Sequence, residues 1–132
     1  MKKVLIADDK ATSRELIRTV LEDCGYAISE AGDGIEALRR ARETEPDLII
    51  LDIHMPGVDG YGVVSELRRE ERFANTPIMA LTASAMQGDR ERALASGFDS
   101  YVSKPIALSA LRKEVERLVD GHESTGATAR SE

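Results

Sequence analysis

The feature that most constrains the fold is the alternation of short, continuous apolar runs with longer amphipathic segments. Residues 4–7, 48–51 and 78–81 are uninterrupted apolar runs. Such runs are typical of strands that are covered on both faces in a parallel sheet. Weaker strand candidates span residues 27–31 and 100–103, and the second alternates as an edge strand would.

Amphipathic segments separate the predicted strands. The first has an apolar stripe at helical spacing and ends at Gly25, a typical helix stop. The stripe comprises Leu16, Ile17, Val20, Leu21 and Cys24. Residues 12–15 and 33–36 predict capping boxes at the starts of the first two helices. Further helices are expected over residues 61–71, from residue 84 to Gly97, and along an apolar stripe from Leu108 to Val119.

Five strand-then-helix repeats predict an α/β fold, with a doubly wound five-stranded parallel sheet and five helices on its two faces. The flavodoxin-like strand order 2-1-3-4-5 is typical of this class, although the pattern itself does not determine the order. Residues 1–119 are expected to form one domain. Residues 120–132 carry Gly, Ser, Thr, Ala and charge, which predicts a disordered polar tail.

Charge and composition exclude several functions. With 24 acidic and 18 basic residues, the formal net charge is −6, which disfavours direct nucleic-acid binding. The apolar run at the start is too short for a signal peptide, and no stretch approaches the roughly 20 apolar residues of a membrane span. Cys24 is the single cysteine and is expected in the core. We therefore expect a cytoplasmic protein without a membrane partner.

Reactive side chains follow four of the predicted strands, where ligands bind in folds of this class. They are Asp8, Asp9, Asp52, Thr82 and Lys104. Taken singly, each has an ordinary interpretation: the aspartates as turn residues, the threonine as a capping hydroxyl and the lysine as a solvated charge. Taken together, they predict that three carboxylates, one hydroxyl and one ammonium meet in one crevice.

Three neighbouring carboxylates repel one another unless they are protonated or neutralised by a cation. Oxygen ligands with few carboxylates suit Mg²⁺, and one such ion together with Lys104 would balance the three charges. This arrangement suits phosphoryl transfer, which needs positioning and charge neutralisation more than covalent chemistry by the protein. Asp52 would be ionised at neutral pH and could act as the nucleophile without a general base.

Four segments carry a family resemblance. They are Asp8-Asp9, the run Leu-Asp-Ile-His-Met-Pro-Gly-Val-Asp-Gly at residues 51–60, Leu-Thr-Ala at 81–83, and Tyr-Val-Ser-Lys-Pro at 101–105. Their order and spacing resemble the receiver domain of bacterial two-component response regulators over residues 3–119. The run at residues 82–86 and the lack of an output domain in this sequence resemble the CheY-like and DivK-like single-domain regulators.

The resemblance implies a role for each acidic residue. Asp52 would be the phosphoacceptor. Asp9, Asp52 and the backbone carbonyl of His54 would bind Mg²⁺, and Asp8 would act through water. The imidazole of His54 would line the mouth of the site and, with Ser84, tune the lifetime of the phosphoryl group. A metal bond from the His54 side chain is the alternative interpretation.

The resemblance also implies a switch. Lys104 would contact the phosphoryl group, Thr82 would move to bond it, and Tyr101 would swing inward behind it. A plain edge-strand role is the alternative for Tyr101. The peptide bond before Pro105 would be cis.

The implied partners are a phosphohistidine donor, on a sensor histidine kinase or a histidine phosphotransfer protein, and a downstream protein target. The target would bind the face formed by the fourth helix, the fifth strand and the fifth helix. The protein would be a monomer or a weak, phosphorylation-dependent dimer. It would not be an enzyme acting on other substrates, because it would catalyse only its own phosphorylation and slow autodephosphorylation.

Three other functions stay open. A phosphatase of the haloacid-dehalogenase type would carry Asp-x-Asp, whereas here His54 stands where the second aspartate would be. A flavodoxin-type cofactor module would need a phosphate-binding loop after the first strand, where Asp8 and Asp9 would repel a flavin phosphate. The third is a degenerate receiver that only binds partners.

Overall fold

The computed structural model describes residues 1–83 and 88–123, the last three by their backbone only. Within these residues all the strands lie in one parallel five-stranded sheet with the order β2-β1-β3-β4-β5, which confirms the predicted topology. The strands are β1 (Lys3–Ala7), β2 (Ala27–Ala31), β3 (Leu48–Asp52), β4 (Ile78–Thr82) and β5 (Ser100–Ser103).

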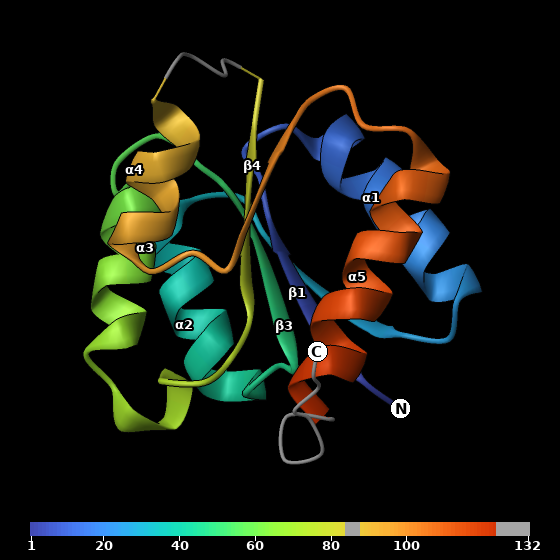
Figure 1. Cartoon of the computed structure of the whole chain (residues 1–132), viewed down its shortest axis with the longest axis horizontal. Helices are drawn as coiled ribbons and strands as arrows, with labels where there is room; N and C mark the ends of the chain where they lie inside the picture. Colours follow the sequence, from blue (N-terminus) through green and yellow to red (C-terminus); the bar gives the residue numbers. More distant parts are fainter. Residues whose placement is uncertain (84–87, 124–132) are drawn as a thin grey trace.

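Helices cover both faces of the sheet (Figure 1). On one face lie α1 (Ala11–Asp23) and α5 (Leu108–Glu123), and on the other lie α2 (Gly34–Thr44), α3 (Gly60–Arg68) and α4 (Asp89–Ser96). Helix α3 ends at Arg68, three residues before the predicted end at residue 71, where a short 3₁₀ helix, η1 (Glu71–Phe73), begins.

The two faces of the sheet carry separate apolar cores, because successive strand residues point to opposite sides. Leu5 and Ile49 pack on the side of α2, α3 and α4, whereas Val4, Ile6 and Ile50 pack on the side of α1 and α5. All the residues of the central strand β3 are buried. The continuous apolar runs are therefore explained by burial on both faces, as predicted.

Two predictions about α1 are wrong. The helix begins at Ala11, and its N-cap Lys10 makes no side-chain cap, so the capping box at residues 12–15 does not form. The reason is local: the Asp8 side chain accepts a hydrogen bond from the Lys10 N–H at 2.9 Å and turns the chain earlier. Cys24 is exposed, because it lies at the C-cap, where Gly25 (φ +95°) ends the helical spacing.

The other helix ends agree only in part with the predicted ones. Half of the predicted capping box of α2 forms: the Asp33 side chain accepts from the Glu36 N–H at 2.8 Å, but the Glu36 side chain accepts from the Gly32 N–H at 2.8 Å and not from the Asp33 N–H. Helix α4 begins at Asp89, and the predicted start at residues 84–87 lies outside the described residues. Helix α5 continues to Glu123 instead of stopping at Val119, since each added residue of a formed helix gains a backbone hydrogen bond. This corrects the start of the predicted tail; residues 124–132 are not described.

Among the described residues no helix is both long enough and apolar enough to cross a membrane.

Candidate metal centre

Acidic side chains from two neighbouring strands meet at the carboxyl edge of the sheet. Asp8 and Asp9 follow β1, and Asp52 ends β3, which pairs directly with β1. One carboxylate oxygen from each of the three residues lies within 4.8 Å of the others. Asp8 and Asp52 are buried, whereas Asp9 is exposed. The predicted convergence of the three carboxylates is therefore present.

Lys104 closes the acidic cluster from β5. Its Nζ donates to Asp8 Oδ2 at 2.8 Å and lies 3.3 Å from Asp52 Oδ2. The backbone N–H of Lys104 donates to the Thr82 carbonyl at 2.7 Å, which extends the pairing of β4 and β5 by one residue. The Lys104–Pro105 peptide bond is cis, as predicted. The ammonium thus points into the crevice and not into solvent.

The loop after Asp52 is held close to β3 by glycines. Gly60 donates its N–H to the Ile53 carbonyl at 2.8 Å, and a Cβ at Gly60 would lie 2.8 Å from the Asp52 carbonyl. A Cβ at Gly34 would lie only 2.0 Å from the Val58 carbonyl. Larger residues at these two positions would push the loop away, so the glycines let the loop pack close to the end of β3. The sequence signal for Gly60 was its place at the end of the 51–60 run, which does not include Gly34.

The electrostatics of the cluster are unequal. Burial favours a raised pKa for Asp8, but hydrogen bonds from Lys104 and from the Lys10 N–H outweigh it and hold the pKa below its usual value. Burial raises the pKa of Asp52, and the negative charge of Asp8 adds to this, against the bonds from the His54 N–H and Lys104. Burial would lower the pKa of Lys104, yet its two carboxylate partners raise it. Lys104 therefore stays protonated, and its ammonium lies closer to the Asp8 carboxylate than to the Asp52 carboxylate.

Of the remaining predicted site residues, Thr82 and His54 lie next to this crevice. Thr82 is buried at the end of β4, beside Leu81, which pairs with Asp52. His54 is exposed at the mouth, and its N–H donates to Asp52 Oδ1 at 3.0 Å. The Tyr101 ring packs against the core on the α3 and α4 side, and its buried hydroxyl has no hydrogen-bond partner among the described residues. Ser84 lies outside the described residues.

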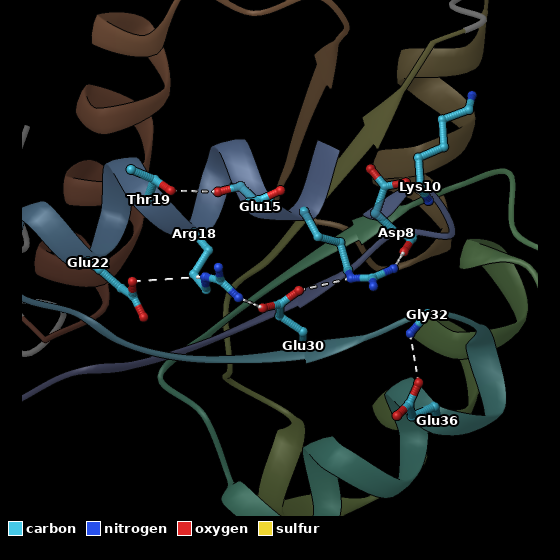
Figure 2. A network of polar contacts seen from close by, with 10 residues as sticks. Asp8, Lys10, Glu15, Arg18, Thr19, Glu22, Glu30, Gly32 and Glu36 are labelled. Atoms are coloured by element: carbon cyan, nitrogen blue, oxygen red, sulfur yellow. Dashed lines mark hydrogen bonds and ion pairs between the residues drawn. The ribbon is translucent and has the colours of Figure 1, made fainter. Parts of the chain in front are cut away.

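Sequence reasoning missed one polar neighbour of the site. Arg14, considered only as part of a capping box, donates from Nη1 to the Asp8 carbonyl at 2.6 Å. Glu30 of β2 accepts from Arg14 Nε at 3.0 Å, and its side chain points towards α1 and Arg18 (Figure 2). The polar Glu30 within a strand was the available signal.

The donor set fits a divalent ion. Its side-chain ligands are oxygen-only, the class that Mg²⁺ prefers. Lys104 neutralises only one of the three carboxylates, so the cluster attracts a further cation. The exposure of Asp9 leaves one side of the cluster open to water, and Mg²⁺ usually keeps several water ligands.

Comparisons with known proteins agree with this geometry. The sequence model of the response regulator receiver domain matches residues 4–116. The polar-differentiation response regulator DivK of Brucella ovis is 41% identical over 107 residues, which cover 81% of this chain and 87% of DivK. The chemotaxis protein CheY4 of Vibrio cholerae superposes with a TM-score of 0.84 at 33% identity, covering 89% of this chain and 98% of CheY4.

A third similar structure is the receiver domain of a sensor histidine kinase from Pseudomonas aeruginosa, with a magnesium ion coordinated in its active site cleft. It has a TM-score of 0.83 and 34% identity, covering 90% of this chain and 98% of that domain. The chain therefore belongs to the response regulator receiver domain family, the domain of two-component systems that interacts with histidine kinases or phosphotransfer proteins.

Proposed function

We propose that this protein is a phosphorylation-dependent switch in which Asp52 accepts a phosphoryl group from a phosphohistidine, in a Mg²⁺-dependent reaction. The donor is a sensor histidine kinase or a histidine phosphotransfer protein. One observation carries the proposal: the buried Asp52 carboxylate lies within 4.8 Å of two further carboxylates and 3.3 Å from the Lys104 ammonium. A site with that charge distribution can bind both a divalent cation and the oxygens of a phosphoryl group.

In the transfer an oxygen of Asp52 forms a bond to phosphorus as the donor's N–P bond breaks, and the bonding electrons return to the imidazole nitrogen. Mg²⁺ would be held by Asp9, Asp52 and the His54 carbonyl, with Asp8 acting through water, and would neutralise charge on the phosphoryl oxygens. The His54 N–H holds the Asp52 carboxylate in one orientation for attack. Lys104 is already in the crevice and needs only to exchange a carboxylate partner for a phosphoryl oxygen.

Phosphorylation then biases an equilibrium between two conformations. Thr82 moves to bond the phosphoryl group, and Tyr101 follows behind it. The hydroxyl of Tyr101 is buried without a partner among the described residues, which supports a ring that can occupy more than one position. The output surface is the face of α4, β5 and α5, where a hollow of about 510 Å³ is lined by charged side chains such as Arg90, Glu114 and Arg117. We expect a downstream protein to bind there.

The chemistry is limited to the protein's own phosphorylation and slow autodephosphorylation. The position two residues after Asp52 holds His54, whereas a phosphatase of the Asp-x-Asp type needs a second carboxyl there as general acid. The exposed His54 side chain and Ser84 would tune the lifetime of the phosphoryl group. Steady release of inorganic phosphate from a phosphate ester would favour the phosphatase instead.

Intact-mass spectrometry after incubation with phosphoramidate and Mg²⁺ tests the proposal. We expect one phosphoryl group in the wild type and none in Asp52→Asn. Asp47→Asn is the matched control, because Asp47 precedes the same strand at its opposite end and accepts from the Lys3 N–H. Lys104→Ala should still bind Mg²⁺ but lose the structural response. A mass gain that persists in Asp52→Asn would reject the assignment.

A further inference from the structure

Every polar atom of Asp8 has a partner. Its N–H donates to the Ala31 carbonyl at 3.1 Å, and its two carboxylate oxygens accept from the Lys10 N–H and from Lys104 Nζ. Its carbonyl oxygen accepts from Arg14 Nη1 at 2.6 Å. The first three contacts belong to the sheet, the turn and the acidic cluster. The fourth comes from a side chain that does not touch the cluster's carboxylates.

The Arg14 guanidinium is oriented by a second set of contacts. Its Nε donates to Glu30 Oε1 at 3.0 Å, and the other oxygen of Glu30 pairs with Arg18, one turn further along α1. The side chains of Arg14 and Glu30 are only 20% and 26% exposed. Burial would raise the pKa of Glu30, but the two arginines outweigh it and keep the pKa low. Glu30 therefore stays ionised and holds the Arg14 guanidinium beside the end of β1.

This arrangement acts on the backbone from which two carboxylates project. Asp8 and Asp9 are consecutive, and Asp9 is exposed, so the burial that restrains Asp8 and Asp52 does not restrain its position. Hydrogen bonding to the Asp8 carbonyl fixes the peptide unit that joins the two residues. Groups that orient metal ligands in this way commonly affect metal affinity by one to two orders of magnitude.

We propose that Arg14 is a positioning residue for the metal centre, which fixes the Asp8–Asp9 peptide through the Asp8 carbonyl, and that Glu30 orients its guanidinium. The inference rests on the proposed function, because it assumes that these carboxylates bind Mg²⁺. The sign of the effect distinguishes positioning from simple charge. Removing a cation near three carboxylates should by Coulomb's law strengthen Mg²⁺ binding, whereas loss of positioning should weaken it.

Calorimetric titration with MgCl₂ tests the sign. We expect Arg14→Gln to raise the Kd for Mg²⁺ roughly tenfold and Glu30→Gln to raise it by a smaller factor. Arg18→Gln is the matched control, because it removes the same charge and another partner of Glu30 without losing a bond to Asp8. Its Kd should stay within about twofold of the wild type or fall. An unchanged or lower Kd in Arg14→Gln would overturn the proposal.

Two further readouts separate positioning from general destabilisation. Without Mg²⁺, amide hydrogen exchange at Asp9 and Lys10 should speed up in Arg14→Gln while the amides of β5 keep their wild-type rates. With phosphoramidate, the half-saturating Mg²⁺ concentration should rise with the Kd, while the rate at saturating Mg²⁺ stays near wild type. Uniformly faster exchange, or a lower rate at saturation with an unchanged half-saturating concentration, would contradict positioning.

Asp9→Asn separates failure of this inference from failure of the proposed function. If Asp9→Asn loses Mg²⁺ binding and Arg14→Gln does not, the metal centre stands and the role of Arg14 is rejected. If Asp9→Asn binds Mg²⁺ like the wild type, the metal centre itself is rejected, and the role of Arg14 with it.

Discussion

The two edges of the sheet carry similar charged side chains but differ in how well the positive and negative charges balance. At the carboxyl edge, one ammonium, Lys104, faces three carboxylates. At the amino ends of β4 and β5, one guanidinium, Arg68, meets one carboxylate, Asp99, at 2.8 Å. Arg68 also donates to the carbonyls of Gly97, Phe73 and Thr76 at 2.9, 2.6 and 2.8 Å.

The difference lies in how completely each edge satisfies its charges. Around Arg68 the charges match, and Asp99 also accepts from the Ile78 N–H at 2.9 Å, so this edge needs nothing from outside. At the carboxyl edge, burial and Asp8 raise the pKa of Asp52, which shows that its charge is poorly compensated. We conclude that the Arg68 edge stabilises the fold, whereas the acidic edge leaves carboxylate charge uncompensated, which agrees with the proposed binding of a cation and a phosphoryl group.

The largest effect is expected at the Arg68 edge. Arg68→Met should lower the free energy of unfolding by about 3 kcal/mol, because several carbonyl oxygens and Asp99 lose their donor. Urea denaturation measures the change, and Mg²⁺ should not reverse it. Arg69→Met is the control: this neighbour is 76% exposed, and its loss should change stability by less than about 0.5 kcal/mol. Equal losses in the free energy of unfolding for Arg68→Met and Arg69→Met would contradict the stabilising role assigned to Arg68.

A smaller loss is expected from Lys104→Met. Asp8, which is fully buried, would lose its ammonium partner, and apo stability should fall by about 2 kcal/mol. Unlike the loss at Arg68, this one should be partly restored by millimolar Mg²⁺, because the ion replaces the missing positive charge. Thermal melts with MgCl₂ and with EDTA give the comparison. No difference between the two conditions would argue against a cation site here.

Asp52→Asn should stabilise the apo protein. The amide removes a poorly solvated charge beside Asp8 and can still accept the His54 N–H. We expect a rise in melting temperature of roughly 4 °C, which corresponds to about 1 kcal/mol in a domain of this size. Asp99→Asn, at the opposite edge, should instead lower it, because its charge is matched by Arg68. If both variants lower the melting temperature, the charge of Asp52 does not destabilise the apo protein.

The smallest effect concerns pH. The pKa of Glu30 is lowered from its ordinary 4.5, so its ionised form favours the folded state above that value. That contribution is lost as the pH falls through the lower, folded-state pKa. Glu30→Gln should therefore cost about 0.5 kcal/mol at pH 7 and progressively less below pH 4.5. Denaturation curves across this range measure the difference, and one that stays constant with pH would contradict the assignment.

The fold was predictable because its main signal is hydrophobic and local. Runs such as residues 48–51 can be buried on both faces only inside a layered sheet, and the β3 observed there is buried throughout. Helix ends were less predictable. The apolar stripe runs one residue past the end of α1 at Asp23, so Cys24 lies at the C-cap and is exposed.

The acidic cluster was predictable because parallel strands carry their ends to one edge, which brings Asp8, Asp9 and Asp52 together. Arg14 was not, because its partners are a backbone carbonyl and a carboxylate from another strand. Periodicity predicts which face a residue occupies, but it does not predict which backbone atom a long side chain reaches. The close approach of Gly60 to Asp52 was also not predictable, because it depends on the path of a loop.

A crystal structure with Mg²⁺ tests the central claim most directly. We predict one ion at the carboxyl edge, bound by oxygens of Asp9, Asp52 and the His54 carbonyl at about 2.1 Å, with water in the remaining positions. Lys104 should remain beside Asp8. A well-ordered crystal grown in excess Mg²⁺ that shows this cluster without an ion, or an ion bound elsewhere, would contradict it.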